Sequence, residues 1–318
     1  MTRDHGGNID AAKARWGGTD WIDLSTGINR CPYPIPPLSP EAWTALPTAS
    51  AQRALLEAAQ TAWRCTAPML AVAGAQAAIQ MIPRLRRPGL ARVLSPTYNE
   101  HAASLAAAGW RVEPCSDLDA LAGADLAVVV NPNNPDGRRF SPDALASLDV
   151  RMLVVDESFA DPVPELSLLP QTGHPGLLVL RSFGKFFGLA GVRLGFVAGH
   201  RADIDALAVM AGPWPVSGAA IEIGRVALGD GVWARQTALR LADDALRADA
   251  LAARAGWRLV GGAHLFRLYD TGNAAAAQER LARHRIWSRI FPWHDRWLRL
   301  GLPGTEAEWE RLSAALGE

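Results

Sequence analysis

The chain has 318 residues, of which 49% are hydrophobic and 20% are charged, so it is long enough for two domains built around apolar cores. Its 32 basic and 32 acidic residues give a formal net charge of +0, which argues against a general nucleic-acid-binding surface. No apolar run is long enough to cross a bilayer, and the first residues lack the apolar stretch of a secretion signal. We therefore expect neither a membrane nor a nucleic acid as a partner.

The three cysteines, Cys31, Cys65 and Cys115, are odd in number and far apart in the sequence. Such spacing provides neither a disulfide framework nor a zinc-binding pattern, and we expect no bound metal. A reducing compartment is the natural environment for unpaired thiols. We therefore expect the protein in the cytoplasm.

A glycine- and proline-rich segment, residues 1–40, opens the chain. We expect it to be filled with turns, apart from a short strand within residues 21–29. Residues 31–37 should be extended, because each proline disfavours a helical conformation of the residue before it. Such a stretch is often a connector, but its polar, glycine-marked ends could equally form one wall of a pocket.

Short apolar runs then alternate with helical patterns. An amphipathic helix is predicted at residues 50–63, followed by a strand at 69–73 and a helix at 77–85. Further buried strands are predicted at residues 92–94, 125–130, 151–155, 177–180 and 194–197. Short buried strands separated by helices predict a mostly parallel α/β sheet, which we assign to a large domain of residues 41–214.

The character of the sequence changes beyond residues 213–215. A long helix rich in Ala, Arg and Leu is predicted at residues 231–255. Strands at 257–260 and 264–268, a helix at 274–284 and extended runs at 286–291 and 297–301 complete the pattern. This pattern predicts a smaller α+β domain over residues 215–318.

Four polar or aromatic residues lie just past the ends of predicted strands: Tyr98, Asn134, Asp156 and Lys185. In α/β sheets the chemistry collects beyond the carboxyl ends of the strands. We therefore expect these four side chains to share one site.

Lys185 stands among glycines, aromatic residues and aliphatic residues. Burial of an ammonium is costly and lowers its pKa, which turns the amine into a usable nucleophile. The alternative is a surface lysine in a loop between two elements. A second feature, Gly74-Ala75-Gln76, joins a strand to a helix whose free N–H groups could bind an anion, although many α/β units turn in this way.

The run from Ser182 to Gly195 resembles the S-x-x-K-x-x-x-L-x-x-x-R-x-G motif of the fold-type I aminotransferase family, class I/II, and every fixed position of that motif is filled. Residues 131–137 match the family pattern N-P-N-N-P-T-G except that Asp136 replaces threonine. The resemblance implies the fold of pyridoxal-phosphate (PLP)-dependent transferases, with residues 1–40 packed on the small domain. It also implies a homodimer.

By the same resemblance, the cofactor would be bound by Gly74, Ala75, Gln76, Tyr98, Asn134, Asp156, Ser182, Lys185 and Arg193. Lys185 would carry PLP as a Schiff base, and Ser182 and Arg193 would hold its phosphate. Asp156 would keep the pyridine nitrogen protonated, and Asn134 would bond the phenolic oxygen. Tyr98 would stack on the ring. The alternatives are a turn cap for Asp156, an Asn-Pro turn for Asn134 and a half-buried aromatic residue for Tyr98.

Two positions depart from the aminotransferase pattern. Phe159 stands where a tyrosine usually helps to set the pKa of the cofactor linkage. Leu46 stands where a tyrosine reaches the phosphate in the partner subunit. A general amino-acid aminotransferase is therefore doubtful.

Phe159, the opening at residues 5–8 and the runs at 24–29 and 32–34 instead resemble the L-threonine-O-3-phosphate decarboxylases of cobalamin biosynthesis. That resemblance implies PLP-dependent decarboxylation of threonine phosphate to (R)-1-aminopropan-2-yl phosphate. An aminotransferase for a phosphorylated amino substrate, such as histidinol phosphate, is the main alternative. A homologue that has lost its cofactor is a further one.

Arg289 and Arg299 suit the phosphate and the carboxylate of a phosphorylated amino acid, because a guanidinium group binds either anion through two hydrogen bonds. In the family, the position of Arg299 binds the carboxylate. The position of Arg289 meets the phosphate in histidinol-phosphate enzymes. The alternative is a solvated basic face formed by Arg283, Arg285, Arg289, Arg296 and Arg299. His5, Asn8 and Asn29 are further candidates for the substrate pocket.

Overall fold

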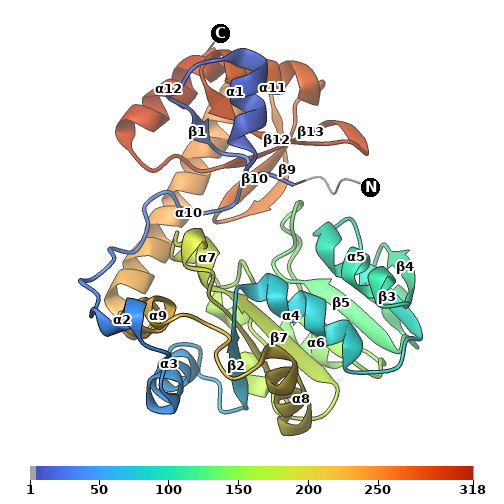
Figure 1. Cartoon of the computed structure of the whole chain (residues 1–318). Helices are drawn as coiled ribbons and strands as arrows, with labels where there is room; N and C mark the ends of the chain where they lie inside the picture. Colours follow the sequence, from blue (N-terminus) through green and yellow to red (C-terminus); the bar gives the residue numbers. More distant parts are fainter. Residues whose placement is uncertain (1–4, 318) are drawn as a thin grey trace.

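The computed structural model describes residues 5–317, and two sheets organise it (Figure 1). The larger sheet has seven strands in the order β2-β8-β7-β6-β5-β3-β4. These strands are β2 (Met69–Val72), β3 (Leu90–Leu94), β4 (Arg111–Cys115), β5 (Leu126–Val130), β6 (Leu153–Asp156), β7 (Leu177–Ser182) and β8 (Gly195–Gly199). All neighbouring pairs are parallel except those that involve β8, which is antiparallel to β2 and to β7. The predicted mostly parallel sheet is confirmed.

The central strands are apolar because both of their faces are covered. Every residue of β5 is buried, and its side chains alternate between two separate cores. Val129 and Val155 belong to one core, whereas Val128 and Val154 belong to the other. This two-sided burial explains the continuous apolar runs in the sequence.

Helices flank the large sheet or connect its strands. They are α2 (Glu41–Thr44), α3 (Ala49–Ala62), α4 (Ala75–Met81), α5 (Asn99–Ala107), α6 (Pro142–Ala146), α7 (Phe183–Phe186), α8 (Arg201–Ala211) and α9 (Gly218–Gly229). Short 3₁₀ turns are η1 (Ile82–Arg84), η2 (Asp119–Leu121), η3 (Pro164–Leu166), η4 (Leu169–Gln171) and η5 (Ala190–Val192). The predicted domain division at residues 214 and 215 stays a prediction; α9, which follows it, packs against α3.

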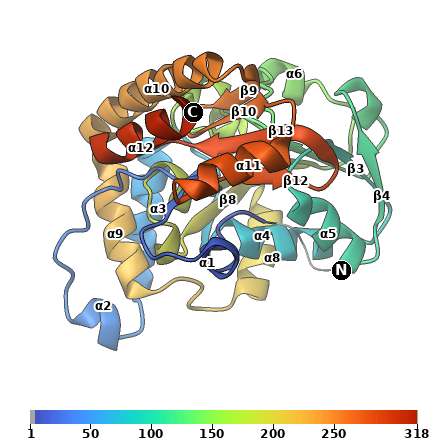
Figure 2. The same cartoon turned by 90° about the horizontal axis from the view of Figure 1, so that it is seen from above.

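The smaller sheet is antiparallel, with the strand order β12-β13-β10-β9. Its strands are β9 (Arg258–Ala263), β10 (Phe266–Asp270), β12 (Arg289–Phe291) and β13 (His294–Gly301). Its neighbouring helices are α10 (Gly231–Arg254), α11 (Ala274–Arg283) and α12 (Glu306–Gly317). Figure 2 shows α10 along one flank of this part, with α11 and α12 over the sheet.

The amino-terminal segment pairs with the carboxyl-terminal part of the chain. Its strand β1 (Ile22–Asp23) forms a two-stranded parallel sheet with β11 (Ile286–Trp287). The segment also contains a helix that we did not predict, α1 (Ile9–Trp16), in which the side chain of Asn8 accepts a hydrogen bond from the backbone of Ala11. The segment is therefore less dominated by turns than its composition indicates. Within residues 5–317, no helix has the length and apolar character of a membrane span.

Candidate active site

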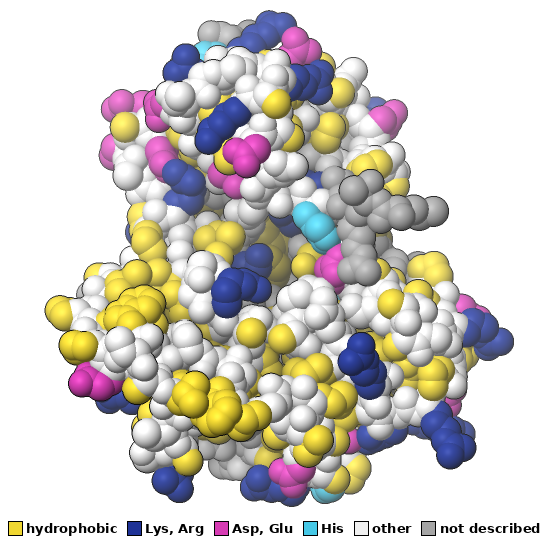
Figure 3. All heavy atoms as spheres, in the orientation of Figure 1, with side chains coloured by type: hydrophobic (Ala, Val, Ile, Leu, Met, Phe, Trp, Pro, Cys, Tyr) yellow, Lys and Arg dark blue, Asp and Glu magenta, His cyan; other side chains and the backbone are white. Residues whose placement is uncertain are grey.

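Two adjoining cavities lie between the carboxyl ends of the large-sheet strands and the small sheet. The inner chamber has a volume of about 160 Å³ and the outer chamber about 300 Å³. Both chambers are lined by Tyr98, Asn134, Phe159 and Lys185, so the two spaces meet at these side chains. The space-filling view shows the molecule hollowed between its smaller upper part and its larger lower part (Figure 3).

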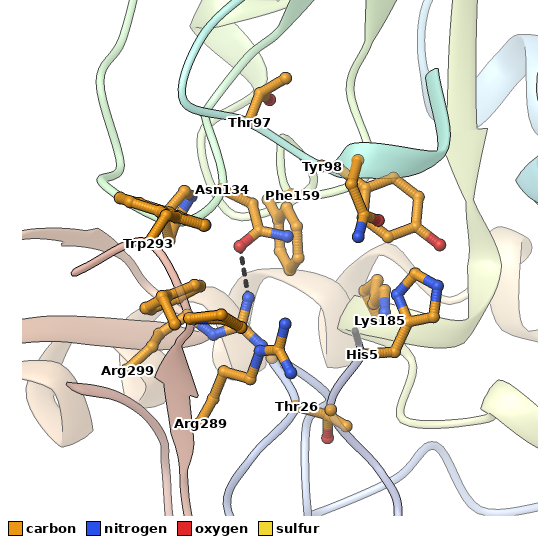
Figure 4. A pocket seen from close by; sticks show the side chains of 16 residues that line it. His5, Thr26, Thr97, Tyr98, Asn134, Phe159, Lys185, Arg289, Trp293 and Arg299 are labelled. Atoms are coloured by element: carbon orange, nitrogen blue, oxygen red, sulfur yellow. Dashed lines mark hydrogen bonds between the residues drawn. The ribbon is translucent and has the colours of Figure 1, made fainter. Parts of the chain in front are cut away.

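Figure 4 shows that the outer chamber has three sources of side chains: the large sheet, the small sheet and the amino-terminal segment. Tyr98, Asn134 and Phe159 come from the first, Arg289, Trp293 and Arg299 from the second, and His5 and Thr26 from the third.

Lys185 lies in α7, directly after the carboxyl end of β7. The protein surrounds its amine closely enough that loss of hydration is the largest influence on the pKa, and the positive charges of Arg299 and Arg193 act in the same direction. The negative charge of Asp156 opposes them, and the pKa of Lys185 falls to about 8. The Nζ atom lies 5.8 Å from the centre of the Phe159 ring. A larger fraction of the amine is therefore neutral near neutral pH than in an ordinary lysine.

The lowered pKa of Lys185 predicts how the stability of the cofactor-free protein changes with pH. Between about pH 8 and pH 10.5 the folded state has lost the Lys185 proton, whereas the unfolded chain keeps it. Stability therefore rises with pH in this window, by at most about 1.4 kcal/mol per pH unit relative to Lys185→Met. Denaturant titrations of both proteins at several pH values measure this difference. A difference that does not change with pH would contradict the lowered pKa.

Asp156 ends β6 and is buried. His101 Nε2 lies 2.8 Å from its Oδ2 atom, while Ser158 donates to Oδ1 through both its backbone and its hydroxyl. Burial alone would raise the pKa of Asp156 and is the largest single influence, but the hydrogen bonds from His101 and Ser158 and the charge on His101 together lower it. The chamber therefore contains a fixed carboxylate.

Gly74 and Arg193, which are far apart in the sequence, lie against each other on the wall of the inner chamber. Gly74 has a φ of +75°, and a Cβ atom there would lie 2.5 Å from Nη2 of Arg193, so only glycine fits. Arg193 itself is left-handed, with a φ of 55°, and donates one N–H to Ala190. Ser182 lies in the same lining. This wall offers hydrogen-bond donors to an anion.

A polar chain links the inner chamber to the amino-terminal segment. Tyr98 donates to Gln76 (3.3 Å), and Gln76 donates to Glu100 (2.9 Å). Glu100 is buried and lies 2.9 Å from Nε2 of His5. His5 thereby closes one side of the outer chamber.

Arg299 is buried on β13 and faces the outer chamber. Burial, reinforced by the charge of Arg289, lowers its pKa to about 9, although Asp23 opposes this. Arg299 donates to the side-chain oxygen of Asn134 and to the backbone oxygen of Ser25. Because Asn134 uses its oxygen for Arg299, its amide N–H groups remain for a ligand in the inner chamber.

Comparison with known proteins places this site in a family. The family model for aminotransferase class I and II matches residues 20–316. The chain belongs to this family. It is 43% identical to the threonine-phosphate decarboxylase of Pseudomonas aeruginosa, across 98% of this chain and 97% of that protein. It is 41% identical to a threonine-phosphate decarboxylase of a Sinorhizobium species, with the same coverage.

A solved structure confirms the fold. The histidinol-phosphate aminotransferase of Sinorhizobium meliloti in complex with pyridoxal 5′-phosphate has a TM-score of 0.80 and 21% identity, and the match covers 97% of this chain and 93% of that one. The predicted fold of PLP-dependent transferases, with a large mixed sheet and a small antiparallel sheet, is therefore correct.

The site of this family member collects most of the residues that the sequence predicted. The inner chamber is lined by Gly74, Ala75, Gln76, Tyr98, Asn134, Asp156, Ser182, Lys185 and Arg193. The outer chamber adds Arg289, Arg299 and His5. The alternative of a solvated basic face does not describe Arg299, because its side chain is buried. Arg283 does form an exposed ion pair with Glu279, and the exposed side chain of Arg296 pairs with the buried Asp270.

Two predicted pocket residues lie elsewhere. Asn29 is buried beneath the chambers and lines neither of them, because its side chain is hydrogen-bonded to Phe186 and Arg240. Asn8 caps α1 and lines a neighbouring hollow of about 350 Å³ instead. The sequence indicated that these residues are polar and near glycines, but it could not indicate which way they point.

Sequence reasoning also missed other contributors. His101 bonds Asp156, and Thr26 and Trp293 line the outer chamber. A signal for His101 was present, since it follows Tyr98 by three residues, and the two rings meet at the start of α5 with their centres 6.2 Å apart. Trp293 lies in the β12–β13 turn, where the sequence gives no indication of a pocket.

Proposed function

We propose that the chain is a PLP-dependent decarboxylase that converts L-threonine O-3-phosphate to (R)-1-aminopropan-2-yl phosphate and CO2, a step of cobalamin biosynthesis. The similarity to two threonine-phosphate decarboxylases, 41–43% over 98% of the chain, carries this proposal. The two arginines of the outer chamber support it, because the substrate has two anionic groups.

The inner chamber suits PLP by the chemistry of its lining. Ser182, Arg193 and the turn after Gly74 offer donors to a phosphate, and the aromatic ring of Tyr98 offers a flat face. Asp156 supplies a carboxylate and Asn134 an amide donor, the partners that a pyridine nitrogen and a phenolic oxygen require. When bound, PLP accepts the electron pair that a broken bond at the substrate Cα leaves behind.

The residues of the chain have distinct tasks in this reaction. Asp156, kept ionised by His101 and Ser158, holds a proton on the ring nitrogen. Lys185 would hold the cofactor through its amine, and a substrate amine bound in its place would leave the lysine side chain free. With a pKa of about 8, the freed amine of Lys185 can deliver a proton near neutral pH. Phe159 beside it excludes water and offers no hydrogen bond.

Arg299 and Arg289 bind the two anionic groups of the substrate. They are register partners on β12 and β13, so both face the same chamber. We assign the carboxylate to Arg299, whose charge is already shared with Asn134 and Ser25. Because the charge of Arg299 is shared in this way, it binds an anion less strongly. This suits a carboxylate that must leave as neutral CO2, since strong binding of the carboxylate would stabilise the ground state and slow the reaction. We assign the phosphate of the substrate to Arg289.

Purified protein with PLP and threonine phosphate is expected to release one CO2 per substrate with no 2-oxo acid present. The measurement is CO2 release together with detection of the amine product. The alternative, an aminotransferase for histidinol phosphate, predicts no CO2 and a product only when a 2-oxo acid is added. Dependence on a 2-oxo acid would therefore contradict decarboxylation.

We also propose that the enzyme is a homodimer, as the family resemblance implies. Exposed apolar side chains gather around α2 and α9, which pack on each other. They are Ile35, Trp43, Leu46, Trp214 and Val226. Trp43 is 69% exposed and Leu46 65% exposed, an unfavourable arrangement for side chains that meet only water. A second copy of the chain would cover them.

Trp43→Glu combined with Leu46→Glu is expected to convert the dimer to a monomer, because charges would be buried without partners in the interface. Sedimentation velocity measures the change in mass. Val209→Glu is the matched control: Val209 is 84% exposed on α8, a helix that lies apart from α2 in both views (Figures 1 and 2). A wild-type protein that sediments as a monomer would contradict the proposal, as would a dimer that withstands the double substitution.

We place the enzyme in the cytoplasm. Its three cysteines, Cys31, Cys65 and Cys115, are free thiols. Burial raises the pKa of the Cys65 thiol and keeps it unreactive. Unpaired thiols are typical of a reducing compartment.

A further inference from the structure

One backbone segment connects the small sheet to the helix that carries Lys185. This segment, residues 24–33, is called the strap below. At its first end, the backbone N–H of Gly301 donates to Leu24 (2.7 Å). One residue later, Arg299 donates to the backbone oxygen of Ser25 (2.7 Å). The strap therefore begins against the arginine that we assign to the substrate carboxylate.

The other end of the strap completes the hydrogen bonding of α7. This helix has four residues, and the last carbonyl groups of a helix have no partner within it. The strap supplies donors: the backbone of Asn29 bonds Lys185 (3.0 Å) and the backbone of Tyr33 bonds Phe187 (2.9 Å). The side-chain amide of Asn29 bonds the carbonyl between them, that of Phe186 (2.9 Å).

The side chain of Asn29 is buried and fully engaged. Its oxygen accepts from the backbone of Cys31 (3.0 Å) and from Arg240 of α10 (2.8 Å). Two donors on one side fix the orientation of the amide, so its N–H groups must face Phe186. No carboxylate or hydroxyl side chain reproduces this combination of donor and acceptors.

The middle of the strap is short and confined. Three residues separate Ser25 from Asn29, so the strap sets how far the backbone of Lys185 can move from Arg299. Gly27 lies between two rings, since a Cβ atom there would come within 2.9 Å of both Phe159 and Phe266. The strap cannot shift without moving the residues that line the chamber.

We propose that Asn29 is a positioning residue for Lys185: through the strap it holds α7 at a fixed distance from Arg299 and directs the lysine amine at the substrate Cα. This inference rests on the proposed function. In decarboxylation, Lys185 must return a proton to the carbon that lost CO2. The strap fixes the site of this proton transfer.

A displaced lysine would favour a different outcome. The proton would go to the aldehyde-derived carbon of the cofactor instead of Cα. One water would then release an aldehyde in place of the amine product, and the amino group would stay on the cofactor as pyridoxamine phosphate. If Lys185 is poorly positioned, the enzyme should therefore lose activity progressively as it turns over substrate.

The experiment compares Asn29→Ala and Asn29→Asp with the wild type, each as holoenzyme. Asn29→Asp keeps the oxygen for Cys31 and Arg240 and removes the donor to Phe186. One readout is the ratio of CO2 released to pyridoxamine phosphate formed. We expect this ratio to fall about tenfold in both variants, the change that loss of a buried hydrogen bond can produce. The KM for threonine phosphate should stay within about twofold, because Asn29 does not line the chambers.

A second readout needs no substrate. The pH titration of the visible absorbance of the bound cofactor reports the environment of Lys185, and we expect its midpoint to move in both Asn29 variants. This titration tests the role of the strap even if the wild-type protein releases no CO2. That outcome would overturn the proposed function alone. Arg30→Met is the matched control, since it breaks the ion pair of the strap with Glu308 and leaves the contacts to α7.

The inference is supported if both Asn29 variants change the product ratio and the absorbance midpoint while Arg30→Met changes neither. It is overturned if the Asn29 variants keep the wild-type ratio and midpoint. It is also overturned if Arg30→Met produces the same changes, because the strap would then act through general stability. Circular dichroism identifies a variant that does not fold. If Asn29→Ala does not fold, Asn29→Asp alone tests the inference.

Discussion

Lys185→Ala is expected to abolish decarboxylation and the visible absorbance of the lysine-linked cofactor together. The substitution removes both the covalent attachment and the proton donor, and proton transfer by a positioned side chain alone contributes about 10² to 10⁴ in rate. We therefore expect a loss of at least about 10³-fold in kcat. Single-turnover CO2 release and absorbance spectra of the purified variant measure the two effects.

The chain offers an unusually clean control for this experiment. It has two lysines, and the other one, Lys13, is on α1, with a half-exposed side chain beside Asp10. Lys13→Ala should keep full activity and absorbance. Borohydride reduction followed by peptide mapping should place the cofactor on Lys185 in the wild type. A label on Lys13, or absorbance retained by Lys185→Ala, would contradict the assignment.

The fold could be predicted because its central strands are buried on both faces. Continuous apolar runs gave β5, β6 and β7 to within a few residues of their observed bounds. The edge strand β4 was missed, since it pairs only with β3, its side chains are half-buried or exposed and it contains a proline. β4 therefore has no continuous apolar run to reveal it.

The site could be predicted where a residue follows directly from a strand end. Asp156 and Lys185 come at or just past the ends of β6 and β7, and parallel strands bring such residues together. Asn29 could not be assigned in the same way. Its partners Phe186 and Arg240 are 157 and 211 residues away in the chain, and a polar residue in a loop can face a pocket or the protein interior with the same local sequence.

The reaction depends on features that the cofactor motif does not contain. Ser182, Lys185 and Arg193 suit a transaminase and a decarboxylase equally. The motif does not include the arrangement around them: Phe159 beside the amine, and the strap that joins Lys185 to Arg299. We propose that the choice of reaction depends on these contacts between the amino-terminal segment, the small sheet and α7.

Asp156→Asn is expected to lower kcat by about 10²- to 10³-fold, the range that corresponds to loss of one member of a buried, hydrogen-bonded charge pair. Asparagine keeps the shape of the side chain but cannot hold a proton on the pyridine nitrogen, and it leaves His101 Nε2 facing an uncharged amide. The cofactor should still attach to Lys185. Its absorbance should remain while CO2 release falls, which separates loss of electron withdrawal from loss of cofactor.

Ser158→Ala is the matched variant for this prediction. It removes one hydrogen bond to Asp156 and leaves the carboxylate, the His101 contact and the backbone donor in place. Its kcat should fall by about tenfold or less, the effect expected for loss of one hydrogen bond to a charged group. Comparison of the loss of kcat in Asp156→Asn with that in Ser158→Ala tests the role of the charge. If Ser158→Ala lost as much activity as Asp156→Asn, the carboxylate would serve to hold the loop in place, and its proposed contact with the ring nitrogen would be wrong.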